Sequence, residues 1–191
     1  MKSATLFVSV FLAATSLVCA APAVTSVEAR SEQPQIFFPD VMIQIKEAWP
    51  DHAYGDTTWG LVSRTNGKEN VQTLMSIHIP NHVSGRKCRY IFTQPHDLGG
   101  SMSAQLFTVI GKIPLDATFN KRPSRDRHLA TFKTDWSIAM AGENAQFTFF
   151  GGETFDCPGG KSLHLELIPV GDNDYIEWYE PYGFAVQAGG W

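Results

Sequence analysis

The sequence predicts an all-β domain, an antiparallel β-sandwich of about eight strands that is held by one disulfide. The first observation is a series of short stretches in which apolar and polar residues alternate, separated by turn residues such as Asn66-Gly67. The second is that no segment of twelve residues carries the apolar stripe of an amphipathic helix. The third is that an even pair of cysteines remains once an N-terminal leader is removed.

The N-terminus has the pattern of a secretory signal peptide, which we assign to residues 1–20. Lys2 gives a positive start, an apolar stretch follows, and the segment ends in small residues at Ala20. The apolar stretch is too short to span a bilayer stably, and no later run reaches that length. We therefore expect a secreted, extracellular protein, with the cell wall as one destination.

The rest of the chain divides into a leader and one domain. Residues 21–35 are small, polar and proline-containing, which predicts a flexible leader with Arg30 as a weak processing signal. Residues 36–191 are enough for a single well-buried core. Cleavage after the signal peptide leaves Cys88 and Cys157, and an even pair in an oxidising compartment predicts a disulfide. It closes a loop of about 70 residues and stabilises by roughly 4 kcal/mol in the chain-entropy model.

The strands are expected wherever alternation is bounded by turns. The cysteine-containing strand has Cys88, Tyr90 and Phe92 at one parity, so these side chains share a face. A later strand has Leu165 and Leu167 on one face and Glu166 on the other. The expected strands cover residues 41–48, 71–79, 87–94, 104–111, 145–150, 163–170, 174–180 and 183–187. The last two long ones, 163–170 and 174–180, are predicted to form a hairpin about the turn at residues 171–173.

Composition excludes two classes of partner. The formal net charge is −4 and becomes about −5 when Lys2 leaves with the signal peptide. An acidic chain of this kind does not favour nucleic acid or an anionic membrane as a partner.

Sequence motifs of catalysis are missing. There is no P-loop, nucleophile elbow, H-E-x-x-H or paired C-x-x-C motif, so we expect no enzyme, no cofactor and no metal. A metal at His78 and His82, or calcium at the turn of residues 171–174, is a minor alternative. A glycosidase would need two acids on different strands to meet. The available acids are Glu153, Asp156, Glu166 and Glu177.

Two surface regions are candidates for ligand binding. Trp49 and Tyr54 lie in a turn-rich stretch, where exposed aromatic rings could stack on sugars or anchor a protein partner. Trp59 follows in the same stretch, and we expect it in the core. The second region is the basic run at residues 120–128, which predicts a solvated loop with a capacity for recognition. Its cationic candidates are Lys121, Arg122, Arg125 and Arg127.

The order of several segments resembles a known family of secreted fungal domains. The family is named after the C-terminal domain of a protein that binds the activating enzyme of a ubiquitin-like modifier, the "But-two" C-terminal domain. The matching segments are PDHAYGDTTWGLVS, SIHIPNHVSGRKCRYIFTQP, SMSAQLFTVIG, FDCPGG and YIEWYEPYGFAV. The resemblance in their order and spacing covers residues 39–187. The resemblance implies a secreted β-sandwich with one disulfide, between Cys88 and Cys157, and no catalytic residues. A role in the cytosolic ubiquitin pathway, which the family's name suggests, does not agree with a secreted chain.

The expected function is therefore a secreted, non-catalytic interaction protein of a fungus. It would be associated with the cell wall or act as an effector on a host, with an unknown protein or polysaccharide as its partner. The alternative is a carbohydrate-active enzyme or a carbohydrate-binding module.

Overall fold

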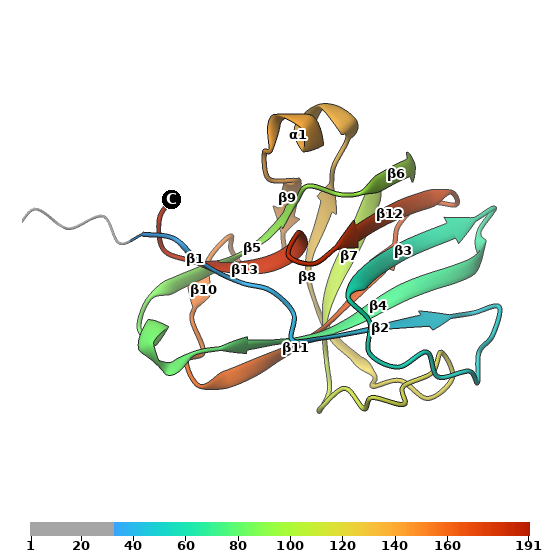
Figure 1. The fold of residues 1–191 in the computed structure, drawn as a ribbon, viewed down its shortest axis with the longest axis horizontal. Helices are drawn as coiled ribbons and strands as arrows, with labels where there is room; N and C mark the ends of the chain where they lie inside the picture. Colours follow the sequence, from blue (N-terminus) through green and yellow to red (C-terminus); the bar gives the residue numbers. More distant parts are fainter. Residues whose placement is uncertain (1–32) are drawn as a thin grey trace, which may run out of the picture. The chain divides into compact units, whose positions relative to one another are not determined.

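The computed structural model describes residues 33–191, so the predicted signal peptide and Arg30 lie outside the described residues. Two antiparallel sheets pack face to face, with one short helix at the upper end of the view (Figure 1). The predicted antiparallel β-sandwich is confirmed. Within residues 33–191, no helix is long and apolar enough to cross a membrane.

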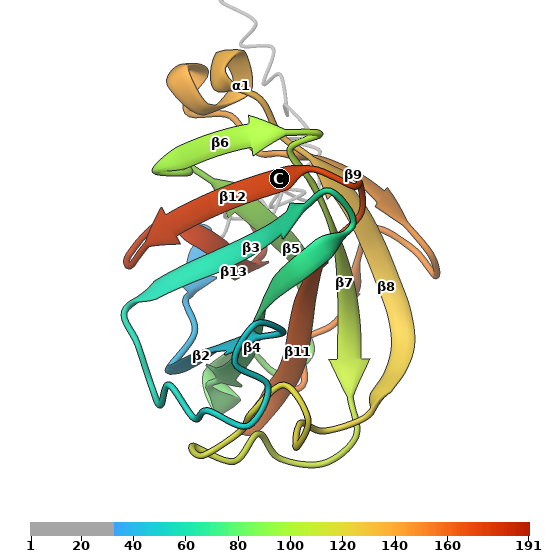
Figure 2. The same cartoon turned by 90° about the vertical axis from the view of Figure 1, so that its right-hand side faces the viewer.

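The larger sheet has nine strands in the order β6-β12-β3-β4-β11-β7-β8-β9, with β2 also pairing with β4. Figure 2 shows how strongly this sheet curls between β3 and β8. Its strands are β2 (Val41–Lys46), β3 (Trp59–Thr65), β4 (Lys68–Ile79), β6 (Asp97–Gly100), β7 (Ser103–Val109), β8 (Arg125–Lys133), β9 (Gln146–Phe149), β11 (Lys161–Pro169) and β12 (Asp174–Tyr179).

The smaller sheet has the order β1-β13-β5-β10 and covers the concave side of the larger one. Its strands are β1 (Gln35–Phe37), β5 (Lys87–Thr93), β10 (Phe155–Asp156) and β13 (Gly183–Ala188). A 3-10 turn, η1 (Asn81–Val83), joins β4 to β5, and the helix α1 (Trp136–Ala141) lies between β8 and β9. The Asp135 side chain caps α1 by accepting a hydrogen bond from the Ile138 amide, and Gly142 ends it in the left-handed conformation.

The main core lies between the two sheets and follows the predicted alternation. Leu165 and Leu167 of β11 are fully buried there, as are Phe92 of β5 and Phe184 of β13. Trp178 of β12 is also fully buried and meets Phe92 edge to face at 5.4 Å between ring centroids. It is the tryptophan that fills the core.

A second, smaller core lies on the outer face of the larger sheet. Ile43, Ile45 and Leu74 point outward from β2 and β4 and are nevertheless fully buried. The β7–β8 connection at the lower end of the sheet in Figure 2 covers them, with Ala117 and Phe119 packed onto the sheet. This cover explains why β2 and β4 are buried on both faces.

The structure corrects three expectations. The predicted hairpin of residues 163–170 with 174–180 is wrong, because β11 and β12 are separated by β4 and β3 in the sheet. The basic run is only partly a loop, since β8 starts at Arg125 and includes Arg127. Trp59 is half-buried and not a core residue: its neighbour Gly60 faces Trp178 inside, so Trp59 points to the outer face.

Candidate binding groove

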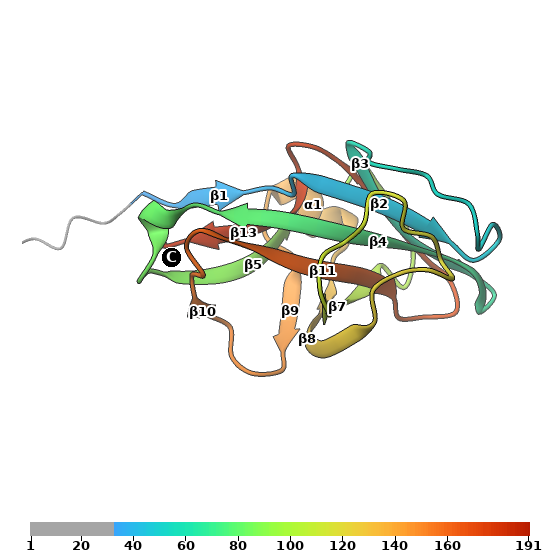
Figure 3. The same ribbon diagram turned by 90° about the horizontal axis from the view of Figure 1, so that it is seen from below.

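A groove opens where the two sheets separate beside β5. The chain before β9 is fastened to β5, because the Ala145 amide donates to the Phe92 carbonyl at 2.9 Å and the Phe92 amide donates to Asn144 Oδ1 at 2.7 Å. The chain then follows β8 as β9, leaves the sheet, and returns to β5 as β10, where Phe155 pairs with Cys88 (Figure 3). The space between these two attachments is not filled by a strand.

Two adjoining hollows occupy this space and share Tyr90 and Phe149. One, of about 170 Å³, lies between Arg89 of β5 and Phe147 of β9. The other, of about 300 Å³, lies against the β9–β10 connection, with Leu129 among its apolar lining residues. Further apolar lining of the larger hollow comes from Phe150, Phe155, Pro158 and Leu163.

The floor of the groove is apolar and uncharged. Tyr90 is 7% exposed and its ring stacks between Phe155 at 4.7 Å and Phe184 at 5.8 Å. Burial raises the pKa of the Tyr90 phenol, so the hydroxyl stays neutral at any physiological pH. A ligand would therefore meet rings and aliphatic side chains at the base.

The rim carries charges of both signs. Lys87 Nζ and Asp156 Oδ1 are 2.6 Å apart, and Arg89 Nη1 lies 4.0 Å from Glu153 Oε1. Arg127 adds a further exposed cation to the larger hollow. An apolar floor with a polar rim is the usual anatomy of a protein–protein interface.

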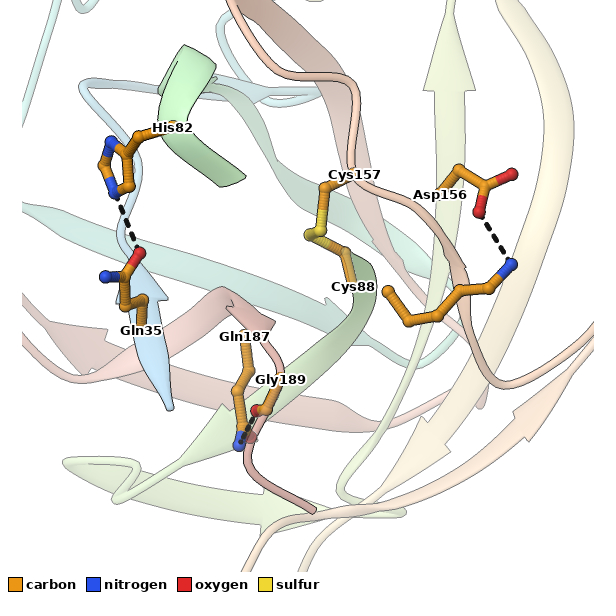
Figure 4. The surroundings of a disulfide bond; sticks show 8 residues. Gln35, His82, Cys88, Asp156, Cys157, Gln187 and Gly189 are labelled. Atoms are coloured by element: carbon orange, nitrogen blue, oxygen red, sulfur yellow. Dashed lines mark hydrogen bonds and ion pairs between the residues drawn. A yellow bond between two sulfur atoms is a disulfide. The ribbon is translucent and has the colours of Figure 1, made fainter. Parts of the chain in front are cut away.

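The predicted disulfide between Cys88 and Cys157 is confirmed, and it anchors one wall of this groove. The two sulfur atoms are 2.11 Å apart and join the start of β5 to the residue directly after β10 (Figure 4). The returning wall is thereby fixed covalently to the floor strand.

The aromatic candidates Trp49 and Tyr54 lie away from the groove, in the connection between β2 and β3. Trp49 is 65% exposed, as expected for a surface residue. Tyr54 is half-buried, with the Lys46 ammonium 4.5 Å from its ring centroid. Trp59, on the next strand, stacks with Tyr179 at 6.3 Å. The Trp59 and Tyr179 rings therefore form a stacked pair on the outer face of β3 and β12.

The four basic candidates separate into different environments. Lys121 is exposed, and Arg127 lies at the rim of the groove. Arg122 and Arg125 turn inward and form ion pairs with the fully buried carboxylate of Glu166. The basic run is therefore not one solvated recognition surface.

The acids proposed for a glycosidase each have a structural partner. Glu166 and Glu177 lie on strands separated by β4 and β3, which puts them roughly 14 Å apart at a strand spacing of about 4.8 Å. That distance exceeds the separation of about 5 to 9.5 Å between glycosidase carboxylates. Glu177 accepts hydrogen bonds from Tyr175 at 2.9 Å and Tyr179 at 2.8 Å. Burial and the bond to Glu177 raise the pKa of Tyr175 to about 12, so it remains a donor.

The candidate metal sites have structural explanations. His82 Nε2 lies 2.9 Å from Gln35 Oε1 (Figure 4). At the turn of residues 171–174, the buried Asp174 carboxylate accepts hydrogen bonds from Ser101 and from the Gly171 amide, so it already has protein donors. Among residues 33–191, no three His, Cys, Asp or Glu side chains gather as metal ligands.

The groove residues Tyr90, Phe149, Phe155 and Leu163 were not candidates from the sequence. The parity of Cys88, Tyr90 and Phe92 predicted a shared buried face, which the structure confirms. The sequence feature that could have indicated the groove is the Gly151-Gly152 pair. These residues have φ of 131° and 111° and direct the chain out of the sheet after β9.

Comparison with known proteins gives one assignment. No curated protein matches the chain. One family model matches residues 37–183, a range that includes the disulfide and the groove, and it is the family that the sequence resembles. The chain therefore belongs to the family described as the Ubiquitin 3 binding protein But2 C-terminal domain.

Proposed function

We propose that the protein is a non-catalytic interaction protein that binds a segment of a partner protein in the groove between β5 and β9. The family description is that of a binding protein, which supports an interaction role. We further propose that it acts outside a fungal cell, either at the wall or as an effector on a host. The pattern of residues 1–20 supports this, and it favours an extracellular partner over a cytosolic protein of the ubiquitin pathway.

The apolar groove is the observation that carries this proposal. Its larger hollow, about 300 Å³, is at the lower end of the range of about 300 to 1,000 Å³ that is typical of ligand pockets. Its size suits one or two side chains of an extended segment better than a large organic ligand. Phe150 is 51% exposed at its edge. Its ring packs against His128 at 4.4 Å between centroids, and its exposed side offers an apolar contact to a partner.

Site-specific crosslinking tests the proposal. A photo-crosslinking residue at the exposed Thr154 is expected to capture a partner from wall and host fractions, whereas one at the exposed Ser137 on α1 is not. Phe150→Ser should reduce capture strongly. Met140→Ser is the matched control, since Met140 is 83% exposed on α1 and lies outside the groove. Unchanged capture by Phe150→Ser would exclude the groove as the binding site.

Localisation is tested separately. N-terminal sequencing of protein recovered from the culture medium should give a chain that starts at Ala21. Retention of the whole chain inside the cell would contradict the extracellular role. It would not bear on binding in the groove, which the crosslinking experiment tests independently.

A second candidate function is carbohydrate binding at the outer face of β3 and β12. The observation that favours it is the stacked pair of Trp59 and Tyr179 beside the Glu177 carboxylate, because flat rings with adjacent polar groups can stack on sugar rings. A panel of wall polysaccharides distinguishes the two candidates. Glycan binding should be lost in Tyr179→Ala and retained in Phe150→Ser, while groove binding should show the opposite pattern.

A further inference from the structure

A fully buried carboxylate lies on the outer face of the larger sheet. Glu166 is in the middle of β11 and has 0% exposure. It pairs across the sheet with Leu74 of β4 and with Phe107 of β7, so all three side chains point to the outer face. The β7–β8 connection and the start of β8 cover this position.

Two arginines share this single carboxylate. Arg125 Nε lies 2.6 Å from Glu166 Oε2 and Arg125 Nη2 lies 3.0 Å from Oε1, a bidentate pair. Arg122 Nε lies 3.4 Å from Oε1. Among residues 33–191, Glu166 is the only carboxylate that forms an ion pair with either guanidinium group. The cluster therefore has two positive charges and one negative charge.

The guanidinium groups are held in place by neighbouring rings and carbonyls. Arg122 lies 4.4 Å from the ring centroid of Phe119 and donates to the Phe119 carbonyl. Arg125 lies 5.6 Å from the ring centroid of Phe107 and donates to Gln72 Oε1 at 3.1 Å. Since these contacts exist without a ligand, little side-chain freedom remains to be lost on binding.

A pocket opens beside the two arginines. Its volume is about 520 Å³, and its lining is Phe119, Asn120, Arg122, Pro123, Ser124 and Arg125. The side chains of Arg122 and Arg125 are 24% and 31% exposed, so solvent reaches them from the pocket. Burial lowers the pKa of Arg122 although Glu166 opposes the shift, the direction expected for a cation that lacks full neutralisation.

We propose that this pocket binds a small oxyanion group, a carboxylate, sulfate or phosphate, as the second anion of the cluster. The planar fork of a guanidinium suits two oxygens of such a group, and the pocket supplies Ser124 as a further donor. The anion comes either from solution or from an acidic side chain of a partner. This site is distinct from the groove, because it lies on the opposite face of the sheet.

Titration with inorganic sulfate at constant ionic strength tests the site. In the full mature protein, the amide NMR shifts of Arg122, Ser124 and Arg125 should saturate with sulfate, while shifts elsewhere remain small. Arg122→Gln should weaken sulfate binding at least tenfold, because Arg125 still neutralises Glu166 but the excess charge is gone. Lys133→Gln is the matched control: it removes one exposed positive charge at the far end of β8, roughly 26 Å away at about 3.3 Å per residue, and should bind as the wild type does.

Two further experiments complete the test. One identifies the source of the anion, and the other uses a second variant in case the first does not fold. Displacement of sulfate by a short peptide of aspartates and glutamates supports the site and indicates a partner's side chain, whereas saturation by sulfate or phosphate alone supports a free anion. If Arg122→Gln does not fold, Arg122→Lys keeps the charge without the fork and should still weaken binding measurably. A linear, unsaturable response to every probe, or equal affinity in wild type and the folded variant, overturns the proposal.

Discussion

Removal of the disulfide is the most informative perturbation of this fold. Cys88 and Cys157 are 69 residues apart in the chain, and the chain-entropy model gives about 4 kcal/mol for a loop of this length. For a domain of this size, each kcal/mol corresponds to roughly 2 to 4 °C in the melting temperature. The double variant Cys88→Ser/Cys157→Ser should therefore melt about 8 to 16 °C lower than the wild type, as measured by circular dichroism.

The loss should also be local. β10 has two residues. Its other side-chain contacts with β5 are the stacking of Phe155 on Tyr90, at 4.7 Å between ring centroids, and the ion pair between Lys87 and Asp156, whose side chains are 60% and 82% exposed. Exposed ion pairs stabilise by about 0 to 1 kcal/mol, and an aromatic pair adds about 0.5 to 1.5 kcal/mol beyond the area it buries. The disulfide, at about 4 kcal/mol, is therefore the strongest of these tethers of the wall. Hydrogen exchange in the double variant should increase most at residues 150–157 and least in β4.

Two results would refute this reasoning. The first is a melting temperature within about 2 °C of the wild type. The second is exchange that rises evenly along the chain, which would mean that the bond stabilises the whole domain without a special role in the groove wall. Thiol labelling of the denatured wild-type protein without residues 1–20 is the control, and it should find no free cysteine.

Four further predictions concern single residues. A Cβ on Gly60 would overlap the indole of Trp178, so Gly60→Ala should destabilise by about 1 to 3 kcal/mol in urea denaturation, and an unchanged midpoint would show that the ring can move. Glu166→Gln should lower the free energy of unfolding by about 3 kcal/mol, the low end for breaking a buried pair, because the arginines retain some solvent. Trp49→Ala should leave the melting temperature nearly unchanged, since the ring is 65% exposed; unfolding would show that it is structural, and normal binding would exclude it from the binding surface. Burial lowers the pKa of His164, so the folded state binds a proton there less readily than the unfolded state does. The contribution of neutral His164 to the stability of the fold is therefore complete above about pH 6.5 and is lost as the pH falls below that value. An NMR titration that gives His164 a pKa at or above the ordinary value would contradict this.

Side-chain parity predicted the inner face of the sandwich well. All eight expected strands are present, and the alternation at Leu165 and Leu167 identified the face that meets the smaller sheet. The alternation of apolar and polar residues is a local pattern, which can be read from the sequence of one strand without knowledge of its neighbours. Strand order is not local, and for this reason the hairpin about residues 171–173 was expected although β4 and β3 lie between its two strands.

The outer face could not be predicted in the same way. Glu166 is polar at an outward position and therefore reads as solvated, yet it has 0% exposure. Its burial depends on the β7–β8 connection, which has no strand alternation, and on Arg125, which is 41 residues away in the chain. The charges of residues 120–128 likewise suggested a solvated loop, because their neutralising carboxylate is on another strand.

Strand β8 explains how a single strand supplies cations to two separate sites. Its register with β7 shifts between Leu106 and Phe107 and again between Phe107 and Val109. A regular strand would place Arg125, Arg127 and Leu129 on one face, but a β-bulge re-aims the side chains around it. Arg125 pairs with Val109 on the outer face, while Arg127 and Leu129 line the groove. The irregular pairing therefore separates the two sites along β8. It places Arg125 beside Arg122 in the oxyanion pocket and Arg127 at the groove.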